Sequence, residues 1–202
     1  MKYITSLFLL LSLTTQAQND WLRYSTLSAK GGINFANFSF RGDGDYDPVQ
    51  KPYFGFVYTD YVYEFLAGKF ELTYSGQGSK YKYSEKGINT SYSIPYLSVG
   101  YVMSFRFFKG MRLDCGGSLD FALSKDAQIP DQRMMDIAGF MGLEIYLNPQ
   151  LSLEARIKGG RWSVTKDDYT REYPFRYEPK NVVYQVGLTY YFNPDVWKDK
   201  KN

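Results

Sequence analysis

One segment of the chain, LSLEARIK at residues 151–158, alternates apolar and polar side chains without a break. A period of two places successive side chains on opposite faces of a β-strand. One face of this strand would carry only leucine, alanine and isoleucine, and the other serine, glutamate, arginine and lysine. Such a strand must lie between an apolar medium and a polar one, and the whole fold has to provide both.

Eight segments of the chain are predicted to be strands, bounded by Gly, Pro, Asn, Asp or Lys. After Ala17 no apolar run reaches 18 residues, so no membrane-spanning helix is expected. The 20 Tyr and 15 Phe also favour strands. The chain is therefore predicted to be all-β. The expected strands cover residues 26–38, 53–63, 69–82, 91–105, 111–123, 134–147, 151–164 and 181–192.

The connections between these strands alternate in length. Tight turns are expected near residues 64–68, 106–110 and 148–150, and longer polar loops at 41–51, 84–89, 124–133 and 165–180. With an even number of strands, the tight turns and both termini fall at one end of the molecule. Short periplasmic turns and long extracellular loops are typical of outer-membrane barrels. The predicted fold is an eight-stranded antiparallel transmembrane β-barrel of the outer-membrane type.

The N-terminus indicates export. Lys2 precedes an apolar stretch at residues 4–13, and a small-x-small triplet ends at Ala17. This pattern predicts a signal peptide over 1–17, cleaved after Ala17. The barrel domain is then expected over 18–192, with a short periplasmic tail at 193–202. The predicted destination is the cell outer membrane, where the partners would be membrane lipid, lipopolysaccharide and the barrel insertion machinery.

Charged residues determine which face of each strand points to lipid. A basic residue on the lipid face at mid-membrane costs about 2–4 kcal/mol, so the charged face of residues 151–158 must point into the barrel. The same phase places the only cysteine, Cys115, on the lipid face, where it has no partner for an internal disulfide. The interior of an eight-stranded barrel is just wide enough for side chains, so the inward charges are expected to pair and to leave no open pore. This predicted lumen network consists of Lys30, Arg112, Asp114, Asp120, Glu144, Glu154, Arg156 and Lys158.

Catalysis is not expected. The chain contains no His, which outer-membrane barrel enzymes characteristically use for proton transfer near neutral pH. Ser152 and Lys158 could form a nucleophile and base, but pairing of charges across the lumen is favoured. The expected pairs join Glu154 to Arg156 and Lys158, and Asp114 and Asp120 to Arg112 and Lys30. The formal net charge of +3 is scattered, so nucleic acid is not an expected partner, and no cofactor is expected either.

The first long loop carries carboxylates at the one, three, five spacing of calcium loops, at Asp43, Asp45 and Asp47. Pro48 and Phe54 stand where a complete calcium loop has Gly and an acidic residue. A weak divalent-ion site and an ordinary solvated acidic loop both remain open.

The loop at 165–180 mixes aromatic and Arg residues, which are enriched in binding hot spots. It could recognise an unidentified extracellular or secretion-system protein, or form an aromatic rim at the membrane interface. The candidate recognition residues are Tyr169, Arg171, Tyr173, Phe175, Arg176 and Tyr177.

The last strand ends in the spacing polar-x-Gly-x-x-apolar-x-aromatic, at Gln185, Gly187, Tyr190 and Phe192. This spacing resembles the terminal signal by which outer-membrane barrels are recognised for insertion. The sequence departs from the usual pattern in continuing for ten residues after Phe192.

Two stretches, LSAKGGINFANF and FELTYSGQGSKY, together with the barrel layout, resemble the PorT-like outer-membrane β-barrel family of the Bacteroidota. The segment Gly31 to Phe35 is the more telling part. The resemblance implies fold and location, and one member group of that family is implicated in type IX protein secretion.

The expected function is that of a non-enzymatic integral outer-membrane barrel with a structural, surface-recognition or secretion-accessory role. The alternative is a soluble lipocalin-like barrel, periplasmic or secreted, that binds an apolar ligand. In that alternative the apolar face of each strand would point inward.

Overall fold

The computed structural model describes residues 24–39, 45–83, 87–129, 131–165 and 179–192, and within these ranges the regular structure consists of nine β-strands. No helix in these ranges is long and apolar enough to cross a membrane. The strands are β1 (Tyr24–Ser39), β2 (Asp45–Asp47), β3 (Val49–Tyr63), β4 (Leu66–Tyr83), β5 (Ile88–Phe108), β6 (Met111–Ala122), β7 (Met135–Asn148), β8 (Leu151–Ser163) and β9 (Lys180–Tyr191).

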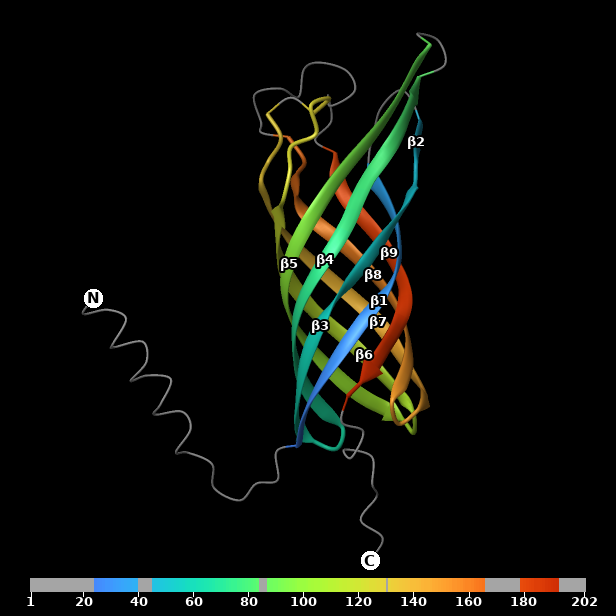
Figure 1. Ribbon diagram of the computed structural model, residues 1–202, viewed down its shortest axis with the longest axis vertical. Coiled ribbons are helices and arrows are strands. Elements are labelled where there is room, and N and C mark those ends of the chain that lie inside the picture. The colour runs from blue at the N-terminus through green and yellow to red at the C-terminus, as the bar shows by residue number, and fades with distance from the viewer. Residues whose placement is uncertain (1–23, 40–44, 84–86, 130, 166–178, 193–202) are drawn as a thin grey trace, which may run out of the picture.

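Eight of these strands form a closed antiparallel ring (Figure 1). The sheet runs in the order β2-β4-β3-β1-β9-β8-β7-β6-β5, and the pairing of β4 with β5 completes the closure. The short strand β2 continues the line of β3 at the far end of β4, where it pairs with Lys80–Lys82. The predicted eight-stranded antiparallel barrel of the outer-membrane type is therefore confirmed.

Three two-residue turns join β3 to β4, β5 to β6 and β7 to β8. They lie at the end of the barrel where β1 begins and β9 ends (Figure 1). Gly110, in the turn between β5 and β6, has a φ of 79°, a conformation that a residue without a Cβ adopts without strain. At the opposite end the hairpin of β4 and β5 projects beyond the other strands (Figure 1).

The first long connection is shorter than the sequence predicted. Residues 45–47 form β2 by pairing with Lys80–Lys82, and β3 already begins at Val49. Only Pro48 separates these two strands. Proline has no backbone N–H to donate to a neighbouring strand, so the hydrogen-bond ladder is interrupted at this residue. The expected loop at 41–51 is therefore wrong for residues 45–51. Strand β5, at 21 residues, also extends beyond its expected bounds at both ends.

The outer surface of the ring is an apolar band. Along β5, Leu97, Val99 and Tyr101 are exposed, whereas Ser98 and Gly100 between them are buried. The other ring strands alternate in the same way. Cys115 is partly exposed and free, on the outward face that its position in the alternation predicts. Exposed apolar residues of the band include Leu27, Ile33, Phe54, Phe56, Phe70, Leu72, Leu113, Leu119, Ile137, Met141, Leu153, Ile157, Val186 and Leu188.

The projecting end shows the opposite arrangement. There Asn89, Ser91 and Ser93 of β5 face outward, and Tyr92 and Ile94 are buried inside. A polar outside around an apolar inside is the pattern of a barrel wall in water, so these levels lie beyond the hydrocarbon. The enclosed apolar cluster, which the sequence reading missed, contains Phe38, Tyr81, Tyr92, Ile94, Tyr96, Ala122, Ile129 and Val164, with Tyr46 packed against it.

Candidate functional site

All eight side chains of the predicted lumen network point into the barrel, and none is more than 5% exposed. They come from β1, β6, β7 and β8, where each occupies the buried position of the alternation. An unpaired charge in such a place would be very costly, so each must find a partner inside the barrel.

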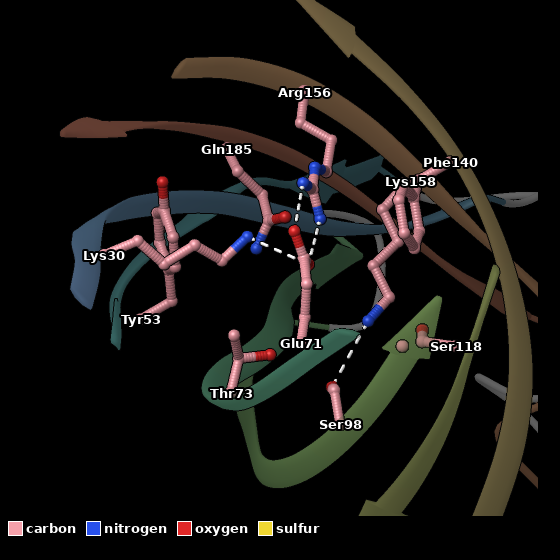
Figure 2. A pocket seen from close by; sticks show the side chains of 11 residues that line it. Lys30, Tyr53, Glu71, Thr73, Ser98, Ser118, Phe140, Arg156, Lys158 and Gln185 are labelled. Atoms are coloured by element: carbon pink, nitrogen blue, oxygen red, sulfur yellow. Dashed lines mark hydrogen bonds and ion pairs between the residues drawn. The ribbon is translucent and has the colours of Figure 1, made fainter. Parts of the chain in front are cut away.

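Glu71 of β4 is the centre of the largest group of charges. It accepts two hydrogen bonds from the Arg156 guanidinium, at 2.7 and 2.8 Å, and one from Lys30 Nζ at 3.0 Å (Figure 2). Lys30 also contacts Glu154 at 3.3 Å. The Arg156 guanidinium lies over the Phe140 ring, 4.3 Å from its centroid. One carboxylate of β4 thus holds two cations, Lys30 from β1 and Arg156 from β8.

A second group lies nearer the two-residue turns, around Lys69 of β4. Its Nζ lies 2.7 Å from Asp114 Oδ2 and 2.6 Å from Glu144 Oε2. Glu144 also accepts hydrogen bonds from Ser152 and from the Tyr191 hydroxyl. Every one of these side chains is buried.

Two further cations complete the interior. Lys158 Nζ donates to Asp120 Oδ1 at 2.8 Å and to Ser98 Oγ at 3.3 Å. Arg112 donates to the side chain and the backbone carbonyl of Ser104, both at 2.9 Å.

The pairing predicted from the sequence is wrong in most details. Lys30 pairs with Glu71 and Glu154, and Lys158 pairs with Asp120. Of the expected pairs, the structure contains the contact of Arg156 with Glu154, at 3.6 Å. The missing partners for Lys30, Arg156, Asp114 and Glu144 are the two β4 residues, Lys69 and Glu71. The alternation KFELTYS, residues 69–75, carries the signal that would have found them, because Lys69 and Glu71 share the face opposite the apolar residues between and after them.

The suggested nucleophile and base are not brought together. Ser152 donates its hydroxyl proton to Glu144, and Lys158 is held by Asp120 and Ser98.

The network leaves almost no free space. A cavity of about 10 Å³ remains among its side chains, bounded by Lys30, Glu71, Arg156 and Lys158 among others (Figure 2). That volume corresponds to about one water molecule. At the projecting end, the cluster of buried apolar side chains lies inside the barrel above this level.

Gln185 and Gly187 of the predicted insertion signal have packing roles inside the barrel. Gln185 donates to Asn34 Oδ1 at 2.8 Å. Gly187 faces Gly32 across the β1–β9 pair, and a Cβ on Gly187 would lie 2.3 Å from the Tyr53 hydroxyl. Any larger residue would displace the buried Tyr53 ring.

The other two signal residues, Tyr190 and Phe192, face outward, with ring centroids 5.7 Å apart. Recognition of the four residues by the insertion machinery stays a prediction.

The candidate recognition residues Tyr169 to Tyr177 lie outside the described residues, as do the predicted signal peptide and the tail at 193–202. Asp43 of the acidic triplet also lies outside them. Asp45 and Asp47 belong to β2, not to a loop, and the Asp47 carboxylate pairs with Lys82 at 2.6 Å. Within the described ranges no group of three or more potential metal ligands occurs.

No family model matches the sequence. No curated protein sequence matches it either. Among solved structures, the chain is similar to Neisserial surface protein A, with a TM-score of 0.53 and 11% identity over 83% of this chain and 98% of that one. It is also similar to the outer membrane protein AlkL, studied in lipid bilayers, with a TM-score of 0.54 and 13% identity over 88% of this chain and 94% of that one. These likenesses show the fold, an eight-stranded β-barrel of the outer-membrane type.

Proposed function

We propose that this protein is a non-enzymatic integral protein of the outer membrane, delivered there after cleavage of a signal peptide over residues 1–17. The observation that carries the proposal is the distribution of side chains in the ring. Apolar residues cover its outside, and ion pairs fill its inside. The lipocalin-like alternative requires the reverse, with apolar residues lining a ligand cavity.

The same observation argues against transport and catalysis as the role. The cavity that remains among the ion pairs holds about one water molecule, which leaves no room at that level for a solute. Ser152 and Lys158, the suggested nucleophile and base, are engaged with Glu144 and Asp120, and the chain has no His. We therefore propose a structural, surface-recognition or secretion-accessory role that is exercised at the long-loop end, since loops carry recognition when a scaffold is otherwise committed.

Two finer parts of this proposal come from the sequence. Membership of the PorT-like family is proposed on the resemblance of the segment Gly31 to Phe35 alone. Recognition of an extracellular or secretion-system protein is assigned to the aromatic and Arg residues of the last long loop. Lipid, lipopolysaccharide and the insertion machinery are the other proposed partners.

Trypsin treatment of intact cells tests the location and the orientation together. We expect the protein in the outer-membrane fraction, with a gel mobility that changes on boiling. In intact cells, trypsin should cut the protein first in the last long loop, after Lys166, Arg171 or Arg176. Cleavage after Lys109, in the β5–β6 turn, should occur only once the cells are lysed. A soluble periplasmic protein with no heat-dependent mobility, or cleavage at Lys109 in intact cells, would refute the proposal.

A further inference from the structure

The projecting hairpin of β4 and β5 carries a polar surface directly above the apolar band. Tyr74 and Leu97 form the last apolar pair on its outer face. Two pairs that contain glycine follow, and then Lys80 faces Ser91 and Lys82 faces Asn89. Lysine, serine and asparagine thus replace apolar residues on the same face of the same two strands.

These residues surround a shallow depression of about 540 Å³ on the outer face of β2, β4 and β5. Lys82 is paired with Asp47, whereas Lys80 has no acidic partner among the described residues. Two ammonium groups, an amide, a hydroxyl and the Asp47 carboxylate therefore line one open surface. Its lining residues are Asp47, Pro48, Lys80, Lys82, Asn89 and Ser91.

Basic side chains continue around the barrel at this end. Lys125 after β6, Arg161 on β8 and Lys180 on β9 are all exposed. Of the carboxylates nearby, Asp126 is engaged by the backbone N–H groups of Ser93 and Gln128. Asp131 is exposed at this end as well, so acidic and basic side chains are mixed around the rim, and Lys80 and Lys82 are the cations that line the depression.

The height of the depression distinguishes between two kinds of anionic lipid. Lys80 lies six residues beyond Tyr74 on β4, which is about 20 Å along a strand. With the usual strand tilt this places it about 15 Å above the apolar band. A phospholipid headgroup layer is only about 5–8 Å thick. The lysines therefore lie above phospholipid phosphates, at the level of the sugars of an outer-leaflet glycolipid.

We propose that Lys80 and Lys82, with Asn89 and Ser91, bind phosphate groups on the inner sugars of lipopolysaccharide. An ammonium group binds phosphate as a point charge, and the amide and hydroxyl can bond to sugar hydroxyls. This inference rests on the proposed outer-membrane location, because only there does the depression meet this glycolipid. The interaction would hold the hairpin against the membrane surface.

Binding of rough lipopolysaccharide to the purified full chain in detergent tests the inference. The double variant Lys80→Gln/Lys82→Gln should bind about 30-fold more weakly than the wild type, since both charges near the anionic surface are lost. The matched control is Arg106→Gln/Lys109→Gln, which removes two basic charges at the opposite end and should bind like the wild type. Lipopolysaccharide from which phosphate has been removed should bind weakly to all three proteins.

Three results would overturn the inference. Equal affinity of the double variant and the wild type would show that the lysines do not bind the glycolipid. Equal binding of the dephosphorylated form would exclude phosphate as the recognised group. Tighter binding of phosphatidylglycerol vesicles, or of inorganic phosphate alone, would assign the surface to another anion. Heat-dependent mobility of each purified variant shows that its barrel is folded, so failure here is distinct from failure of the proposed location.

Discussion

Glu71→Gln should lower the free energy of unfolding by about 3–5 kcal/mol, the usual effect of removing one partner from a buried ion pair. Glu71 is 6% exposed and binds Arg156 and Lys30 together. Glutamine keeps its shape but leaves both cations with Glu154 as their remaining anionic contact. Urea unfolding in phospholipid vesicles, followed by tryptophan fluorescence and by gel mobility, measures the change.

The matched control is Glu64→Gln in the β3–β4 turn. Glu64 also pairs with an arginine, Arg106, at 3.1 Å, but its side chain is 92% exposed. Exposed pairs of this kind contribute about 0–1 kcal/mol. If the two substitutions have equal effects, the interior carboxylates are hydrated and the lumen is open to water.

Ile157→Arg should prevent most of the protein from reaching the inserted, heat-modifiable form. Ile157 lies on the outward face of β8, 52% exposed, opposite Met141 and Tyr184 of the neighbouring strands. A basic residue facing hydrocarbon costs about 2–4 kcal/mol near the bilayer midplane and about 0–1 near its edges. The inserted fraction is measured by gel mobility with and without boiling, after folding into vesicles.

Ser91→Arg provides the comparison for this variant. It adds the same charge to an outward position, but on the projecting part of β5 above the apolar band. It should insert as the wild type does. Equal insertion of Ile157→Arg and Ser91→Arg would mean that the apolar band does not face lipid.

The faces of the strands could be predicted from the sequence because charge permits only one phase. In β8, Glu154, Arg156 and Lys158 cannot face lipid, and the alternation then orients every neighbour. The partners of these charges could not be predicted in the same way. Arg156 reaches Glu71 across the lumen, and that contact depends on how the strands are staggered around the ring, which no single strand records.

The projecting end was missed for a different reason. Residues Tyr92, Ile94 and Tyr96 alternate with Ser91, Ser93 and Pro95 at the same period of two as the band, but here the apolar side chains point inside. A period of two does not reveal where the membrane ends. The sequence alone therefore does not show that the apolar side chains change from the outer to the inner face of β5 near Pro95. Strand β2 was also not predicted from the sequence. Pro48 interrupts the hydrogen-bond ladder to β4 between β2 and β3, which otherwise continue each other.

Planar-bilayer recording of the purified full chain tests most directly the central claim that the barrel is closed by its own ion pairs and apolar cluster. Insertion is verified separately by heat-dependent mobility of protein recovered from the same vesicles. The interior contacts and the cavity of about 10 Å³ predict no stable conductance steps at any applied voltage that the bilayer withstands. Persistent steps of porin size, reproduced in independent insertions, would contradict the account.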